Sequence, residues 1–68
     1  MIRFSKRLQL LRKEANLKQI DLAKILNTTQ RRISHLESGK IEPDLATLVA
    51  IAKYFKVTLD YLVGITDY

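Results

Sequence analysis

Only three residues, Asn-Thr-Thr at 27–29, separate two stretches of the chain in which apolar residues recur at helical spacing. Leu22 and Leu26 lie four residues apart before this break, and Ile33 and Leu36 lie three apart after it. Both spacings place apolar side chains on one face of a helix. Because so short a connection allows no gradual change of direction, the two predicted helices must meet at a sharp angle, which is a helix-turn-helix unit.

The helical spacing continues along the rest of the chain. Thr29, Asp44 and Thr58 are good N-cap residues, since their side-chain oxygens can accept from free amides of the next turn. Two Asn and two Gly follow predicted helices, and both residue types tolerate the left-handed conformation that ends a helix. No segment shows a convincing strand alternation, so the predicted fold is all-α. The five predicted helices cover about residues 4–15, 19–26, 30–38, 45–55 and a short segment from 59 to Gly64.

The chain of 68 residues has the length of one small domain, which we expect to span 1–68. It has no Cys, so it has no disulfide framework and no thiolate metal site. Its stability must therefore come from an apolar core, which 47% hydrophobic residues can supply. We expect the small Ala23 where the helices around the short turn approach closely. The predicted core consists of Phe4, Leu8, Leu11, Leu22, Leu26, Ile33, Leu36, Leu48, Ile51, Ala52, Phe55 and Leu62.

The net charge of +5 is unevenly distributed. Residues 1–40 hold ten Lys and Arg against three acids, whereas residues 41–68 hold two against four. A basic half favours a polyanionic partner, of which nucleic acid is the commonest, and the alternative is a solvated surface that only aids solubility. No apolar run is long enough to span a membrane and no signal-peptide pattern follows the basic start, so a cytoplasmic location is expected.

Several features occur together in a fixed order. They are Leu17-x-Gln19, Leu22-Ala23, the short turn, Ile33-Ser34-x-Leu36-Glu37-x-Gly39-Lys40, Pro43, Leu48, Ile51-Ala52, and Val57 with the Thr58 cap. With this set the sequence resembles the helix-turn-helix domain of the phage repressor and Cro family, often called XRE-like, over about residues 4–64. The resemblance implies a compact five-helix, lambda-repressor-like DNA-binding domain whose helix-turn-helix motif spans about 19–38.

Two residues depart from the pattern of the family. Asn27 stands where Gly is usual, and Asn also adopts the left-handed conformation. Lys18 stands where Ser, Thr or Asn often caps the first helix of the motif. This Lys is expected to weaken the cap while adding a positive charge near the DNA backbone.

The resemblance places Thr29, Gln30, Arg31 and His35 where family members contact base edges. Gln can pair bidentately with adenine and Arg with guanine, each pair giving about 1–3 kcal/mol of discrimination. Thr29 is also the expected N-cap and could contact a phosphate or a thymine methyl group instead. For His35 the alternatives are a phosphate contact or plain solvation. The structural alternative for all four is an exposed polar helix face.

The resemblance also implies contacts to the DNA backbone, which position a protein on the duplex without reading its sequence. In the family, the Gln that begins the first helix of the motif binds phosphate and braces the first Gln of the next helix, here Gln30. A solvated charge is the alternative for each basic residue. The predicted phosphate-contacting residues are Lys18, Gln19, Arg32, Ser38 and Lys40.

Glu37 is an acid on the helix expected to approach DNA, and the resemblance implies a structural ion pair between it and Arg12. Catalytic chemistry is not indicated. With no Cys and a single His, a metal site is not expected, and two isolated Gly cannot form a phosphate-binding loop. We therefore expect no enzyme activity, no cofactor and no small-molecule ligand.

The predicted function is that of a sequence-specific regulator of transcription that binds double-stranded DNA. The family default is a repressor, bound as a homodimer to a pseudo-palindromic operator. An antitoxin or another protein-interaction module with the same fold is the alternative. Binding of a membrane surface by the first helix is disfavoured, because its apolar face is needed for the core.

The C-terminal segment 57–68 is the expected dimerisation surface. Leu59, Tyr61, Val63 and Ile65 give it more apolar residues than so short a helix needs for a core. The alternatives are that these side chains cover the core of the monomer or dock onto a further domain.

Overall fold

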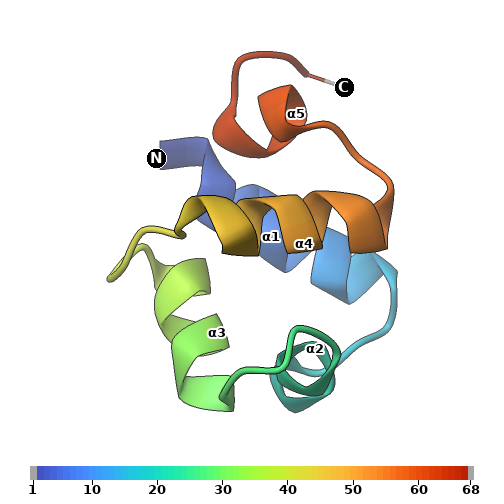
Figure 1. Ribbon diagram of the computed structural model, residues 1–68, viewed down its shortest axis with the longest axis vertical. Helices are drawn as coiled ribbons and strands as arrows, with labels where there is room; N and C mark the ends of the chain where they lie inside the picture. The colour runs from blue at the N-terminus through green and yellow to red at the C-terminus, as the bar shows by residue number, and fades with distance from the viewer. Residues whose placement is uncertain (1, 68) are drawn as a thin grey trace.

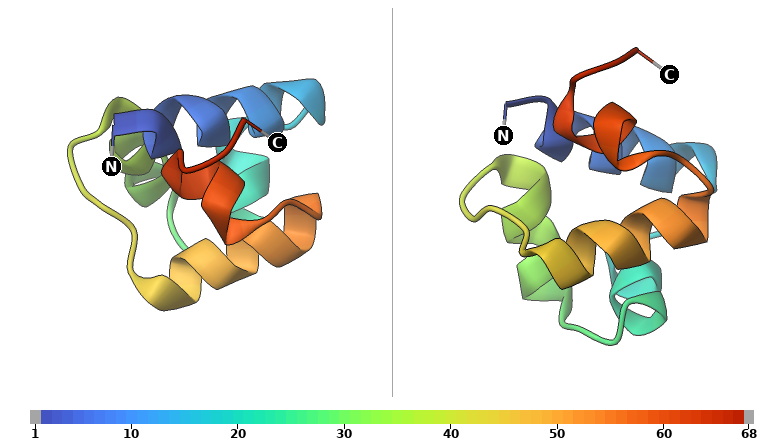
Figure 2. Two further views of the ribbon diagram at one scale, coloured as in Figure 1. Left: turned by 90° about the horizontal axis from the view of Figure 1, so that it is seen from above. Right: turned by 45° about the horizontal axis from the view of Figure 1, so that its top comes forward.

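The computed structural model describes residues 2–67, and the side chains of 3–67. Figure 1 shows α1 and α4 crossing the middle of the molecule, with α2 and α3 at one end and α5 at the other. The second view of Figure 2 shows the same arrangement. Over the described residues the chain forms five helices and no strand, so the all-α prediction is confirmed. The helices are α1 (Ile2–Glu14), α2 (Gln19–Ile25), α3 (Gln30–Ser38), α4 (Leu45–Phe55) and α5 (Leu59–Val63).

The observed first and last residues of each helix lie within two residues of the predicted ones. α3 has the predicted bounds because strong signals flank it on both sides. Thr29 Oγ1 accepts from the Arg32 amide at 3.1 Å, and Gly39 has the left-handed φ of 81°. α1 begins two residues earlier than predicted, since no helix-breaking residue precedes Phe4, and ends one residue earlier. The prediction that α2 includes Leu26 was wrong by one residue, because Leu26 already leaves the helical conformation at ψ 3°.

Both Asn residues adopt the left-handed conformation, with φ of 58° at Asn16 and 56° at Asn27. Lys56 does so as well, with a φ of 56° at the end of α4. This left-handed residue was not predicted, because Lys has no special tolerance for positive φ. Asp44 and Thr58 act as N-caps, accepting from Thr47 N at 2.9 Å and from Tyr61 N at 3.0 Å.

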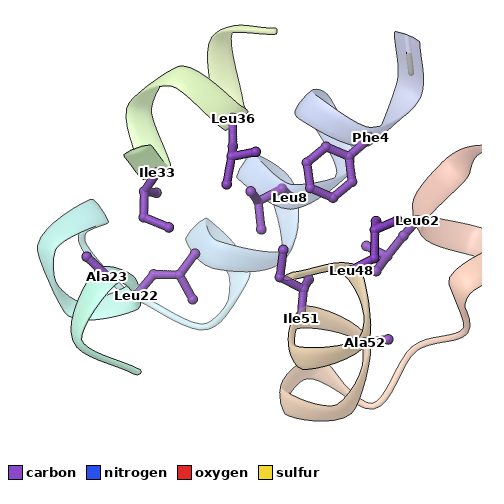
Figure 3. Close-up of a cluster of buried hydrophobic side chains, with 10 residues drawn as sticks. All are labelled: Phe4, Leu8, Leu22, Ala23, Ile33, Leu36, Leu48, Ile51, Ala52 and Leu62. Carbon is purple, nitrogen blue, oxygen red and sulfur yellow. The ribbon is translucent and has the colours of Figure 1, made fainter. Parts of the chain in front are cut away.

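Apolar side chains from all five helices converge on one core (Figure 3). Leu11, Leu26 and Phe55, which were predicted as core, are only partly buried and pack against its margin. They lie at the edges of their helical faces, where each side chain is still partly reached by solvent. The buried hydrophobic residues are Phe4, Leu8, Leu22, Ala23, Ile33, Leu36, Leu48, Ile51, Ala52 and Leu62. None of the described helices is long and apolar enough to cross a membrane.

Candidate nucleic-acid interface

The turn between α2 and α3 is held closed by backbone hydrogen bonds. Thr28 N donates to Ala23 O at 2.8 Å, and Asn27 N donates to Lys24 O at 3.2 Å. Ala23 is 1% exposed, so its small side chain is enclosed between the helices, as expected from the sequence. The left-handed Asn27 turns the chain sharply, and α3 begins three residues later.

α3 has one buried face and one polar face. Ile33 and Leu36 are fully buried, which fixes the rotation of the helix about its axis. This rotation leaves Gln30 and Arg31 exposed in the first turn, next to the exposed Thr29. Because the first turn follows directly on the α2–α3 turn, it lies at the end of the molecule away from α5 (Figure 1).

His35 lies one turn further along α3 and is half-buried. Its backbone carbonyl closes the end of the helix, accepting from Gly39 N, from Lys40 N at 3.0 Å and from Ser38 Oγ at 3.2 Å. The structure therefore groups Thr29, Gln30 and Arg31 on one exposed turn, with the less exposed His35 one turn further along, four residues after Arg31.

The start of α2 lies beside the end of α3, which brings the two groups of predicted phosphate contacts to neighbouring helix ends. Lys18 is exposed before α2, and Ser38 and Lys40 are exposed at the end of α3. The Lys18 ammonium group has no acceptor, so it cannot cap α2 with its side chain. Instead, Asp21 Oδ2 accepts from Lys18 N at 2.8 Å, which supplies half of a capping box.

Arg32 points toward α4. Its Nη2 donates to Thr47 Oγ1 at 3.2 Å and lies 3.8 Å from Asp44 Oδ1. Hydrogen bonding by Thr47 lowers the pKa of Asp44, and the charge of Arg32 adds to this effect. Arg32 thus joins α3 to the first turn of α4, a partner that the sequence did not reveal.

Arg12 and Glu37 form the expected ion pair. Arg12 Nε donates to Glu37 Oε2 at 2.6 Å, and Nη2 donates to Oε1 at 3.0 Å. Hydrogen bonding to Glu37 raises the pKa of Arg12 against the opposing effect of burial. The side chains are 10% and 3% exposed, so the pair joins α1 to α3 inside the protein.

Gln19 has a partner that differs from the one implied by the resemblance. Its Nε2 donates to Glu37 Oε1 at 3.1 Å. No local sequence signal marks this contact, because the two residues are 18 positions apart and meet only when α2 packs against α3. The expected brace between Gln19 and Gln30 stays a prediction.

A hollow of about 190 Å³ lies between the α2–α3 turn and α4. Its wall is mixed in polarity, with Arg32 and Thr47 among the polar groups. Elsewhere among residues 2–67, no group of three or more His, Asp or Glu side chains is placed to hold a metal ion. The hollow is lined by Leu26, Asn27, Thr28, Arg32, Ile33, Leu36, Ala46, Thr47 and Ala50.

A sharply bent helix pair with an exposed polar turn at the start of its second helix defines the class of helix-turn-helix domains. The family model described as helix-turn-helix matches residues 8–62 of the chain. The chain belongs to this family, in its phage-repressor or XRE-like branch.

Two relatives are transcriptional regulators by name. The chain is 43% identical over 61 residues to the HTH-type transcriptional activator BcrR of Enterococcus faecalis, covering 90% of this chain and 30% of BcrR. It is 39% identical over 59 residues to the uncharacterized HTH-type transcriptional regulator YqaE of Bacillus subtilis, covering 87% of this chain and 51% of YqaE. The chain thus spans less than a third of the length of BcrR and about half of that of YqaE.

Solved structures show the same fold. The P22 c2 repressor in complex with a synthetic operator matches with a TM-score of 0.81 and 29% identity, covering 87% of this chain and 89% of the repressor chain. A transcriptional regulator from Listeria innocua matches with a TM-score of 0.85 and 38% identity, covering 90% of this chain and 57% of that protein. The lambda-repressor-like architecture is therefore confirmed.

Proposed function

We propose that this chain binds double-stranded DNA in a sequence-specific way and regulates transcription, with α3 in the major groove. One observation carries the proposal. Burial of Ile33 and Leu36 fixes α3 so that Gln30 and Arg31 are exposed together on its first turn. The N-terminal turn of the second helix is the part that contacts base edges in helix-turn-helix complexes.

The side chains divide by chemistry into base-reading and backbone-contacting groups. Gln30 and Arg31 read bases through their paired donors and acceptors, and Thr29 and His35 flank them. The exposed Lys18 and Lys40 meet phosphates of the DNA backbone, together with Gln19, Arg32 and Ser38. Arg32 can do so only with the guanidinium nitrogens that its bond to Thr47 leaves available. We assign no reaction and no cofactor to this surface.

Repression is the simplest effect, because a small domain placed over a promoter blocks polymerase without further parts. The matched P22 c2 protein is a repressor bound to an operator, whereas BcrR is named as an activator. We therefore propose a repressor, acting in the cytoplasm as a homodimer on two half-sites whose centres are about 10 bp apart.

The C-terminal apolar residues separate into two pairs. Tyr61 and Val63 pack against the core, which fits the alternative that these side chains cover the core of the monomer. Leu59 is 38% exposed and Ile65 is 72% exposed. The proposed dimer surface in segment 57–68 therefore narrows to Leu59 and Ile65, on the side of the molecule away from α3.

Selection from a random pool of duplex DNA tests the proposal. We expect the pool to converge on a pseudo-palindrome. We also expect the logarithm of the affinity to fall linearly with the logarithm of salt concentration, because phosphate contacts release counterions. Failure to select any sequence would contradict the proposal and favour a protein-interaction module such as an antitoxin.

A further inference from the structure

The Gln19 amide is held from inside the protein by the ion pair of Arg12 and Glu37. Glu37 Oε1 accepts from Gln19 Nε2 at 3.1 Å and from Arg12 Nη2 at 3.0 Å, while Oε2 accepts from Arg12 Nε at 2.6 Å. The first residue of α2 is thereby attached to the last turn of α3 by its side chain.

The chemistry of the carboxylate decides which end of this amide faces inward. Glu37 lies against a guanidinium group, and an ionised carboxylate offers acceptors only. It can therefore bond only the NH₂ end of Gln19. The carbonyl oxygen branches from the same planar carbon in a different direction, so Gln19 Oε1 is turned away from Glu37.

Arg12 fixes the backbone before Gln19 as well. Its Nη1 donates to Leu17 O at 2.8 Å, and Leu17 N donates to Arg12 O at 3.1 Å. One guanidinium group thus sets both the chain that leads into α2 and the carboxylate that holds the first side chain of α2. Because Arg12 is 8% exposed, water competes little for these bonds.

We propose that Glu37, aligned by Arg12, is a positioning residue for DNA recognition that acts through Gln19. It holds the Gln19 amide in one orientation, with Oε1 free to accept from an N–H donor. This inference rests on the proposed DNA-binding function. Phosphate oxygens only accept, so Gln19 can bind phosphate through its second Nε2 proton or its backbone N–H, but not through Oε1.

The fixed orientation also gives Oε1 a defined type of partner. That partner is an N–H donor, such as the Gln30 side-chain amide or an amino group of a base. A Gln19 free to rotate would present either end to the DNA. With Glu37 in place the amide keeps one orientation, so the entropy of choosing it is lost during folding and not during binding.

The free protein provides the first test, by NMR of the side-chain amides. One Nε2 proton of Gln19 is expected to resonate downfield of those of the exposed Gln30 and to exchange with water more slowly. A Gln19→Met variant assigns the signal. Equal shifts and equal exchange rates for Gln19 and Gln30 would overturn the inference without any DNA present.

A cycle of variants tests the role in binding. The variants are Gln19→Met, the double variant Arg12→Met with Glu37→Met, and the triple variant. The double variant removes one charge of each sign, so the net charge of +5 is kept and long-range attraction to DNA is unchanged. A buried ion pair replaced as a unit by apolar residues of similar size can leave a protein folded.

Gln19→Met is expected to weaken specific binding about three- to tenfold, the effect of one hydrogen bond. The double variant should weaken it by a similar factor, and the triple variant by no more than the double. Losses that multiply would show that Gln19 acts independently and would overturn the inference. If the double variant does not fold, the chemical shifts and exchange rates of the Gln19 and Gln30 side-chain amides in the native chain decide whether Glu37 holds Gln19. A native chain that selects no DNA contradicts the proposed function itself.

Discussion

Two arginines of α1 tie this helix to opposite ends of the molecule, and they do so with different partners. Arg12 bonds chiefly the buried carboxylate of Glu37 on α3, and its Nη1 also donates to Leu17 O. Arg7 bonds chiefly backbone carbonyls, since its Nη1 donates to Tyr61 O and, at 2.6 Å, to Thr66 O, while its Nη2 lies 3.4 Å from the exposed carboxylate of Asp67. The Arg7 guanidinium also lies 4.3 Å from the centre of the Tyr61 ring.

The difference shows how the two ends divide their tasks. Every residue has a backbone carbonyl, so the Arg7 contact demands only two side chains of α5 and the tail, the Tyr61 ring and the Asp67 carboxylate. Leu59 and Ile65 take no part in it and are exposed. The Arg12 contact needs a carboxylate at position 37 and draws Gln19 into the same bonds. The end with the candidate interface is thus held by a buried network of side chains, and the other end mainly by bonds to main chain, with exposed contacts to Asp67.

Removing the acid at the interface end has the largest expected effect. Glu37→Ala leaves the buried Arg12 charge without a partner, which should lower the free energy of unfolding by about 3–5 kcal/mol. Denaturant unfolding measures this loss. Glu14→Ala, which removes an exposed acid of α1, is the control and should change little. An unchanged melting temperature in Glu37→Ala would contradict the structural role of the pair.

Substitution of Arg7, at the α5 end of the molecule, should lower stability but should not weaken DNA binding specifically. Arg7→Met removes charged hydrogen bonds to two carbonyls and an exposed contact with Asp67, so we expect a loss of about 1.5–3 kcal/mol in the free energy of unfolding. Affinity for an isolated half-site should fall no more than in Lys6→Met, which loses the same charge from an exposed position. A larger loss of affinity in Arg7→Met would erase the distinction between the ends.

The cap of α3 should have a smaller effect that is local to the interface end. Thr29→Ala removes the acceptor of the Arg32 amide and should cost about 1 kcal/mol of stability. Thr29→Asn keeps a capping oxygen and should recover most of it. If the Asn variant recovers stability but not base preference, Thr29 has a DNA contact in addition to its cap.

The smallest expected effect belongs to Asp44, whose ion pair with Arg32 is an exposed counterpart of the Arg12–Glu37 pair. Bonding by Thr47 lowers the pKa of Asp44 below its ordinary 3.8 in the folded state. Its stabilising contribution is therefore complete above that pH and is lost as the pH falls through the lower, folded value. Asp44→Asn keeps a capping oxygen but does not titrate. The stability difference between wild type and variant should shrink with acidification, and a constant difference would contradict the assignment.

Local signals made much of the fold predictable. Thr29 and Gly39 are strong start and stop signals for α3, so both ends of this helix were predicted from sequence. The bonds from Gln19 to Glu37 and from Arg7 to Tyr61 were not, because they join residues 18 and 54 positions apart that meet only through packing. The left-handed Lys56 was missed because nothing in its residue type favours that conformation. The pairing of Arg12 with Glu37 was inferred from the family resemblance and not from spacing. The base-reading roles stay predictions.

Base preference in the Arg31→Ala variant tests the central claim most directly. The affinities of wild type and variant are measured for the selected site and for each of its single-base-pair substitutions, at one salt concentration. We predict that the variant loses about 1–3 kcal/mol of discrimination at one base pair in each half-site and keeps its preferences elsewhere. Base preference unchanged at every position would show that the first turn of α3 does not read the DNA sequence through Arg31.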